Sequence, residues 1–384
     1  MSVTTPKNFV ANGVIAGIKA SGQPDLALVR NLGPRFDAAG VFTSNRVKAA
    51  PVLWSQQVLV DQSLQMVILN SGGANACTGP DGFADTHATA EGAAAACSIG
   101  AIDVAVCSTS LIGVRLPVDK IIAAISSLVD HADADGGDKA AAAIMTTDTH
   151  PKQAGHTEPT GWSIGAMAKG AGMLAPGLAT MLVVITTDAV IGPDPLQASL
   201  SEACRLSFDR LDSDGCMSTN DTVIIMSNGA SEVRPDAEDF TDALLSVCTD
   251  LAQQLLGDAE GAAHDIAITV SGAATEEEAV QVARTISRSN LFKCAVFGAD
   301  PNWGRVLAAI GTTDAAFEPD QIDVAFNGVQ VCRNGGIGAA RELVDLTARA
   351  VEVGVDLHAG DAIATIWTND LTYDYVKENA EYSS

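Results

Sequence analysis

The chain has 384 residues, of which 47% are hydrophobic and 18% are charged, a composition that fits a folded protein with a large core. Acidic residues outnumber basic residues by 47 to 22, and the net charge of -25 argues against a nucleic-acid partner or an anionic membrane, because both need clustered Lys and Arg. No apolar stretch reaches the roughly 18 residues that span a bilayer, and the N-terminus lacks an apolar signal core, so we expect a cytoplasmic protein without a membrane segment.

In the first half of the chain, apolar runs predict strands and helical spacing predicts helices. The expected strands are 26–30, 66–70 and 103–107, and the expected helices are 83–97 and 117–128. We expect 150–161 to be an irregular connection, because it is rich in Pro, Gly and His and lacks periodicity. At roughly 150 residues per domain, the length predicts two lobes.

The second half begins with a continuous apolar run over 181–185, which predicts a buried strand. Further strands are expected at 222–226, 266–270, 292–297, 324–326, 351–357 and 363–367, and helices at 196–211 and 240–255. Thr275 and Glu278 have the spacing of a capping box, which predicts a helix with a buried face that ends at Ile286. Because helices and strands do not alternate strictly, we expect a layered α/β or α+β fold rather than a regular barrel.

Thr180 stands at the start of the strand over 181–185, directly after a glycine-rich segment, 169–177. A hydroxyl in this position is either a structural strand start or a reactive group held on a rigid element. Other nucleophile motifs are missing, because the sequence has no Gly-x-Ser-x-Gly elbow and no Cys-His pair close to a strand end. Lys169 precedes its glycines, which does not fit a phosphate loop of the Walker type.

Metal-binding patterns are weak in this sequence. The six histidines are dispersed and form no His-x-x-x-His pair. The stretch 210–221 approaches a calcium loop, but its first position is Arg210 and its last is Asp221 instead of a bidentate Glu. We therefore expect no metal, and a non-catalytic calcium- or ligand-binding module is kept as an alternative that requires an intact chain.

A threonine hydroxyl is a poor nucleophile unless a base lies beside it. The most compact solution is a threonine at a chain N-terminus, where its own α-amine, with a pKa of about 8, serves as the base. Cleavage of the Ala179–Thr180 bond would create this arrangement, and the preceding glycine-rich segment would tolerate the strained geometry of the attack. The residues alone leave both the structural and the catalytic interpretation of Thr180 open.

Six ordered segments, spread over nearly the whole chain, form a specific set. They are Asn70-Ser-Gly-Gly-Ala-Asn-Ala76, Ala143-Ile-Met-Thr-Thr-Asp148, Lys169-Gly-Ala-Gly-Met-Leu-Ala-Pro with Ala179-Thr180-Met-Leu, Asp214-Gly-Cys-Met-Ser-Thr-Asn-Asp221, Asp300-Pro-Asn-Trp-Gly-Arg305 and Asn379-Ala-Glu-Tyr-Ser-Ser384. Together they resemble the ornithine acetyltransferase (glutamate N-acetyltransferase) family of arginine biosynthesis. The resemblance implies a layered two-lobe α/β sandwich with an N-terminal threonine as nucleophile.

The resemblance also implies a precursor that cleaves itself between Ala179 and Thr180 into an α-chain, 1–179, and a β-chain, 180–384, which assemble as an α2β2 heterotetramer. The implied reaction moves acetyl from N-acetylornithine to glutamate through acetyl-Thr180 and releases ornithine. No metal and no bound organic cofactor are implied, although some family members also use acetyl-CoA as donor. The rival is a self-cleaving N-terminal-threonine amidohydrolase or aminopeptidase that passes its acyl group to water.

The resemblance assigns site residues position by position. Thr180 matches the nucleophile, and Thr109 and Ser110 match the oxyanion-hole pair. The substrate contacts match Thr146, Lys169, Thr180, Glu260, Asn379 and Ser384. Opposite charges would then recognise the amino acid, because Lys169 can pair with a carboxylate and Glu260 with the amino end of ornithine. We also expect 214–221 to hold the loop around Thr180 through side-chain-to-backbone bonds.

Two positions depart from the family pattern. The family usually has Gly where this chain has Ser110, so a positive φ there would strain the backbone. The family's Glu-Gly-x-Thr-Lys is Glu260-Gly-Ala-Ala-His264 in this chain, which removes a hydroxyl and a fixed charge near the expected ornithine contact. Both departures predict a change in donor preference or rate.

Overall fold

The computed structural model describes residues 1–175 and 181–381. The chain divides into two compact units. The first unit comprises Met1–Met173, Gly177–Asp209 and Met217–Leu255, and the second comprises Leu174–Pro176, Arg210–Cys216 and Leu256–Ser384. Within the described ranges no helix is long and apolar enough to cross a membrane.

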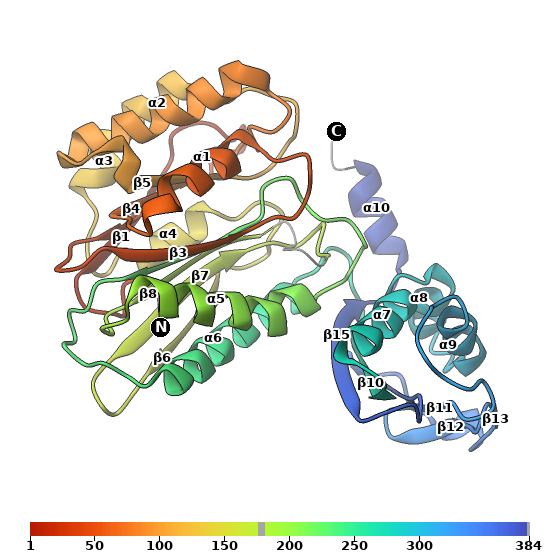
Figure 1. The fold of residues 1–384 in the computed structure, drawn as a ribbon. Helices are drawn as coiled ribbons and strands as arrows, with labels where there is room; N and C mark the ends of the chain where they lie inside the picture. Colours follow the sequence, from red (N-terminus) through yellow and green to blue (C-terminus); the bar gives the residue numbers. More distant parts are fainter. Residues whose placement is uncertain (176–180, 382–384) are drawn as a thin grey trace. The chain divides into compact units, whose positions relative to one another are not determined.

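The first unit is built on two sheets (Figure 1). The four-stranded sheet has the order β1 (Phe9–Val14), β2 (Leu26–Asn31), β4 (Met66–Asn70) and β5 (Val104–Ser108). The five-stranded sheet has the order β3 (Asp37–Phe42), β9 (Thr222–Ser227), β8 (Leu182–Thr187), β7 (Ser163–Lys169) and β6 (Lys152–Thr157). The strands β4, β5, β7, β8 and β9 are buried at every residue. Their nearly continuous apolar sequences are those of strands covered on both faces.

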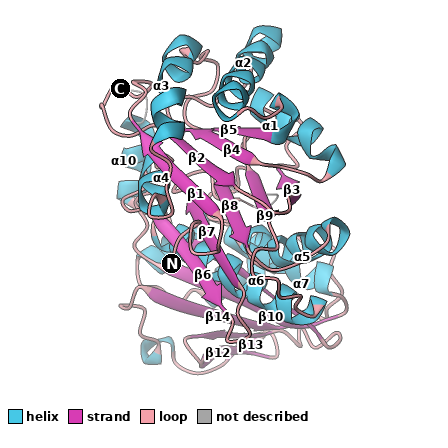
Figure 2. Cartoon of the chain, turned by 90° about the vertical axis from the view of Figure 1, so that its left-hand side faces the viewer, coloured by secondary structure: helices cyan, strands magenta, loops and turns pink. Residues whose placement is uncertain are grey.

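Helices cover the outer sides of the two sheets. They are α1 (Ala50–Val58), α2 (Gly79–Cys97), α3 (Val118–Asp130), α5 (Pro193–Leu206) and α6 (Ala237–Gly257). A further helix, α4 (Gly137–Ala143), contacts β1 and β2 of one sheet and β7 of the other. Figures 1 and 2 show α1, α2 and α3 over the four-stranded sheet, and α5 and α6 beside the five-stranded sheet. One buried cluster contains side chains of both sheets, among them Leu28, Ile68, Leu182 and Ile224. The two sheets are therefore the inner layers of an α/β sandwich.

Strand register brings the ends of several strands to common edges of the sheets. β4 and β5 are parallel, and their last residues, Asn70 and Ser108, are paired. β8 is antiparallel to β7, with Leu182 opposite Lys169, and parallel to β9, with Leu182 opposite Thr222. The end of β7 and the beginnings of β8 and β9 therefore lie side by side.

The second unit contains a six-stranded sheet with helices packed on it (Figure 1). Its strands, in sheet order, are β13 (Gly336–Ile337), β12 (Val329–Arg333), β11 (Asp323–Phe326), β14 (Ala350–Asp356), β10 (Asp265–Ala273) and β15 (Ala362–Asn369). Its helices are α7 (Glu276–Ser287), α8 (Asn290–Phe297), α9 (Trp303–Ile310) and α10 (Tyr373–Glu381). A separate core joins the sheet to α7, with Ile268 and Ile366 packed near Val282.

The expected mixed α/β architecture is confirmed, but one element is of the wrong type. The stretch 292–297, expected to be a strand, lies in helix α8. The side chain of Ser289 accepts a hydrogen bond from Phe292 N at 3.3 Å and caps this helix. Apolar runs of this length fit either structure, and the N-cap serine is the signal that favours the helix.

A strand also occurs where an irregular connection was expected. β6, within 150–161, pairs with β7 along its whole length. Its sequence, Lys-Gln-Ala-Gly-His-Thr, lacks apolar alternation because Lys152 occupies a fully buried position. A buried charge needs a tertiary partner, so the strand could not be recognised from its own residues.

The capping box before α7 is half formed. Thr275 accepts a hydrogen bond from Glu278 N at 3.2 Å, as expected. The Glu278 carboxylate instead accepts from Ala316 N at 3.0 Å. The expected buried face of the helix is confirmed through Ile286.

Candidate active site

Thr109, one of the two expected oxyanion-hole residues, is held by the loop that follows β4. Thr109 N donates to Asn70 O at 3.1 Å, and Gly73 N donates to Thr109 O at 3.0 Å. The Asn70 side chain closes the same loop, because its amide donates to Gly73 O at 3.0 Å and its oxygen accepts from Ser108 Oγ at 2.5 Å. Thr109 is 2% exposed, so its position is fixed by buried hydrogen bonds.

Lys169, the last residue of β7, is brought to Thr109. Its side chain is 1% exposed, and Nζ donates to Thr109 Oγ1 at 3.2 Å. An ammonium has only donors, so it occupies a lone pair of the threonine oxygen. The Thr109 O–H must then point to another acceptor, and this orientation suits a donor of an oxyanion hole. Two residues that lie 60 positions apart in sequence thus form one polar pair.

The Asp148 carboxylate accepts hydrogen bonds from Thr146 and from two other residues. One carboxylate oxygen accepts from Lys152 Nζ at 2.6 Å and from Gly170 N at 2.7 Å. The other oxygen accepts from Thr146 N at 2.9 Å and Thr146 Oγ1 at 3.4 Å. Burial alone would raise the pKa of the Asp148 carboxyl, but the charges of Lys169 and Lys152 outweigh burial and hold the pKa well below its usual range. Asp148 therefore fixes both the Thr146 turn and the beginning of the glycine-rich segment.

Lys19 adds a further positive charge to this region. Its Nζ donates to Pro24 O at 2.9 Å and to Met145 O at 2.7 Å. Burial lowers the pKa of Lys19, and the charge of Lys169 lowers it further, whereas Asp148 and Asp25 act in the opposite direction. The three lysines Lys19, Lys152 and Lys169 outnumber the carboxylates Asp148 and Asp25 beside them, and this excess of positive charge favours binding of an anionic group.

The segment 214–221 makes side-chain-to-backbone bonds to its surroundings. Asn220 Nδ2 donates to Ala74 O at 2.6 Å and to Ser108 O at 2.8 Å, linking the loops that follow β4 and β5. Asp221 Oδ1 accepts from Met181 N at 3.0 Å. These bonds place the segment between the loop that carries Thr109 and the beginning of β8.

Ser110 has a φ of 113°, in the region that favours glycine. The strain expected at this departure is therefore present. We expect Ser110→Gly to raise the free energy of unfolding by about 1 kcal/mol, because relief of a strained φ outweighs the added flexibility of glycine in the unfolded chain. Urea denaturation measures the change.

A matched control is Ser127→Gly, which makes the same exchange inside helix α3. Glycine in a helix interior costs about 0.5–1 kcal/mol, so this variant should be less stable than the wild type. If both variants were less stable than the wild type, the result would contradict the strain at Ser110.

Glu260 lies in the second unit, in a cavity of about 290 Å³. The same cavity is lined by Asp214, Lys293 and Tyr375. Burial raises the pKa of Tyr375 to about 12, and the charges of Asp214 and Glu260 add to this shift. Burial lowers the pKa of Lys293, opposed chiefly by Asp214. The cavity thus presents carboxylates and an ammonium, groups that complement the two charges of an amino acid.

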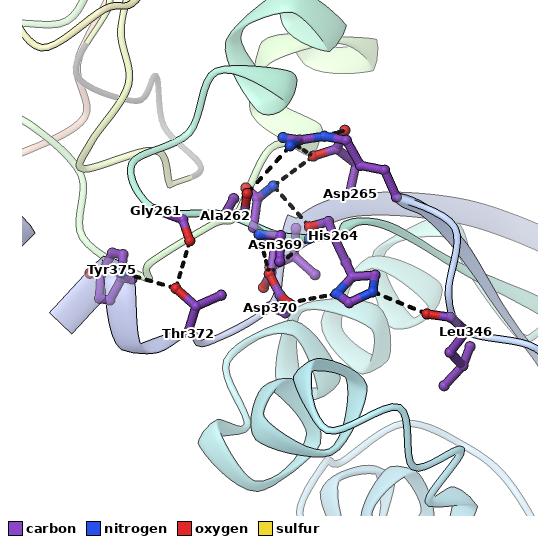
Figure 3. Close-up of polar contacts among 12 residues, drawn as sticks. Gly261, Ala262, His264, Asp265, Leu346, Asn369, Asp370, Thr372 and Tyr375 are labelled. Atoms are coloured by element: carbon purple, nitrogen blue, oxygen red, sulfur yellow. Dashed lines mark hydrogen bonds and ion pairs between the residues drawn. The ribbon is translucent and has the colours of Figure 1, made fainter. Parts of the chain in front are cut away.

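The loop after Glu260 is tied to the segment that leads into α10 (Figure 3). One Asp370 oxygen accepts from Ala263 N and His264 N, each at 3.0 Å, and the other lies 2.6 Å from His264 Nδ1. His264 Nε2 lies 3.1 Å from Leu346 O. Thr372 Oγ1 donates to Gly261 O at 2.6 Å. Both ring nitrogens of His264 face acceptors, so this departure from the family pattern serves to fix the loop.

The other expected site residues are Asn379, Ala179, Thr180 and Ser384. Asn379 is exposed on α10 and donates to Tyr375 O at 3.0 Å, within its own helix. Ala179, Thr180 and Ser384 lie outside the described residues. No group of three or more His, Cys, Asp or Glu suited to a metal ion occurs in the described part of the chain.

Sequence reasoning missed three members of the site. Asp148 stands in a segment that carried the family resemblance, but no role was assigned to it. Lys19 and Lys152 have no local signal, because each is recognisable only by the groups that the fold places around it.

The fold and the buried polar groups at the strand ends define a layered α/β protein with an enzyme-like site. The model of the ArgJ family matches residues 10–384. The chain belongs to the ArgJ family.

Relatives match the chain over its entire length. The arginine biosynthesis bifunctional protein ArgJ of Streptomyces coelicolor is 64% identical over 384 residues, which is 100% of each chain. The protein of the same name from Mycobacterium tuberculosis strain H37Rv is 57% identical, over 100% of this chain and 96% of the relative. A crystal structure of ornithine acetyltransferase complexed with ornithine, from M. tuberculosis, has 61% identity and a TM-score of 0.45, and it covers 47% of this chain and 96% of its own.

Proposed function

We propose that this chain is an acetyltransferase of arginine biosynthesis that moves acetyl from N2-acetyl-L-ornithine to L-glutamate through an acetyl-Thr180 intermediate. The observation that carries the proposal is the buried Lys169–Thr109 pair, which leaves an oriented hydroxyl donor near a cluster of positive charge. The names of the full-length relatives support the pathway.

The nucleophile arises by self-cleavage. The Thr180 hydroxyl attacks the carbonyl carbon of Ala179, the C–N bond breaks, and an ester and a free α-amine result. Water hydrolyses the ester, which leaves a carboxylate on Ala179 and restores the hydroxyl of Thr180. The products are the α-chain, 1–179, and the β-chain, 180–384.

Acetyl transfer then uses the new amine as base. It takes the proton of the Thr180 hydroxyl while the oxygen attacks the acetyl carbonyl of N-acetylornithine. The Thr109 hydroxyl and the backbone N–H of Ser110 stabilise the oxyanion, and each such donor is worth about 10²- to 10³-fold in rate. The proton passes to the leaving amine of ornithine. The amine of glutamate attacks acetyl-Thr180 in the same way and leaves as N-acetylglutamate.

Substrate recognition uses opposite charges. Lys169, supported by Lys19 and Lys152, binds the substrate carboxylate. Thr146, fixed by Asp148, provides a hydroxyl contact. Glu260 binds the amino end of ornithine, and Asn379 and Ser384 complete the substrate contacts.

The two cleaved chains remain interleaved. β7 precedes the cleavage point and β8 follows it, yet the two strands pair from Ile164 to Lys169. Cleavage therefore leaves both chains in one sheet, and two such pairs form the α2β2 assembly. The reaction takes place in the cytoplasm. It uses no metal and no bound organic cofactor. Acetyl-CoA is an additional acetyl donor.

The decisive experiment incubates the purified protein with N-acetylornithine and glutamate between pH 6 and 9. We expect ornithine and N-acetylglutamate in equal amounts, measured by mass spectrometry. Omission of glutamate is the control. Absence of transfer throughout this range would refute the proposal, and ornithine release that glutamate does not stimulate would identify an amidohydrolase.

A further inference from the structure

Asp221 and Met181 occupy matching places at the beginnings of two parallel strands. Met181 immediately precedes β8, and Asp221 immediately precedes β9, whose Thr222 pairs with Leu182. Thr222 N donates to Met181 O at 3.2 Å, and Asp221 Oδ1 accepts from Met181 N at 3.0 Å. Hydrogen bonds with Asp221 and Thr222 thus hold the peptide groups on both sides of Met181.

The Asp221 side chain is deeply buried. The residue is 0% exposed, and its second oxygen, Oδ2, has no hydrogen-bond partner among the described residues. Burial raises the pKa of Asp221 well above its usual range, while the Met181 N–H, the charge of Lys169 and contacts with Ser218 act in the opposite direction. Burial therefore disfavours the charged form of this carboxyl.

We propose that Asp221 is a positioning residue that holds the Met181 N–H and thereby fixes the residue that follows the proposed nucleophile, Thr180, in the chain. This inference rests on the function proposed above. Met181 is covalently bonded to Thr180, so a hydrogen bond to the Met181 N–H restricts the peptide group that joins the two residues. Misplacement of a reacting group by about 1 Å costs about 10²-fold in rate.

The test compares two replacements of similar size. Asp221→Asn keeps a neutral oxygen acceptor for Met181 N, whereas Asp221→Leu removes it. The control is Thr222→Val, which alters the adjacent buried residue by removing the hydroxyl bond to Asn220 O at 3.0 Å but keeps both backbone bonds of Met181. Cleavage is followed by intact mass at timed intervals, and acetyl transfer by kcat and KM.

For Asp221→Leu we expect cleavage and kcat to fall by about 10²-fold, with the KM values of N-acetylornithine and glutamate unchanged. Asp221→Asn and Thr222→Val should stay within about tenfold of the wild type. Amide exchange at Met181 should become faster in Asp221→Leu alone, and this measurement remains informative if the wild type has no transferase activity.

Three results would overturn the inference. Wild-type cleavage in Asp221→Leu would show that the bond has no role in positioning. An equal loss in Asp221→Asn and Asp221→Leu would show that the ionised carboxylate is required instead. Unchanged exchange at Met181 in Asp221→Leu would show that the bond does not hold the strand. A wild type that cleaves but transfers no acetyl would refute the proposed function and leave this inference standing.

Discussion

Replacement of Asp148 by leucine is expected to lower the free energy of unfolding by about 3–5 kcal/mol, the usual cost of removing one member of a buried ion pair. The carboxylate and the Lys152 ammonium have fully buried side chains and are 2.6 Å apart. Leucine removes the charge that balances Lys152 and Lys169, together with the acceptor for Thr146 N and Gly170 N. Urea denaturation at pH 7 measures the loss.

The double variant Asp148→Leu with Lys152→Met is the matched control. Replacing both members of a buried pair by apolar residues is often close to neutral. The double variant should therefore lose less stability than the sum of the two single variants, with a coupling energy of about 1–3 kcal/mol. Strict additivity would contradict the ion pair as the source of the effect.

The effect of Asp148 should depend on pH. Its pKa is lower in the folded protein than the value of about 3.9 in an unfolded chain. Between the two pKa values the unfolded state binds more protons, so stability rises with pH. The contribution of Asp148 is complete above about pH 5 and is lost as the pH falls through the folded pKa. The difference between wild type and Asp148→Leu should accordingly shrink below about pH 4.

The sequence predicted the buried strands of the first unit well, because their signal is local. Met66–Asn70 and Leu182–Thr187 are apolar runs that a parallel or central strand requires. The sequence could not predict β6, since Lys152 looks exposed until Asp148 is placed beside it. The helix α8 was mistaken for a strand because its apolar run is short and its signal, the cap at Ser289, lies outside that run.

The site residues also divide into those with a local sequence signal and those without one. Lys169 and Thr109 were expected from motifs, and the structure brings them within 3.2 Å. The charged groups beside them, on Asp148 and Lys19, are placed by contacts between residues up to 126 positions apart in the chain. Such contacts are set by strand register and loop packing, which a single sequence does not encode locally.

Chemistry and the family resemblance both predict cleavage of the Ala179–Thr180 bond. The variant Thr180→Ala tests this prediction. We expect this variant to remain one chain of 39.3 kDa, whereas the wild type gives two chains. Alanine lacks the hydroxyl that attacks the Ala179 carbonyl, so no ester forms. Acetyl transfer should fall by about 10⁴- to 10⁶-fold, the effect of losing a covalent nucleophile. Denaturing intact-mass measurement and ornithine release report the two losses separately.

Two further variants separate chemistry from structure. Thr180→Ser keeps a hydroxyl and should still give two chains and measurable transfer. Thr157→Ala removes a hydroxyl from the exposed end of β6 and should behave as the wild type. If Thr180 were only a structural strand start, Thr180→Ala would cleave as the wild type does, or neither protein would cleave. Cleavage in Thr180→Ala would exclude this hydroxyl as the attacking group, because the remaining side chain has no atom that can form the ester.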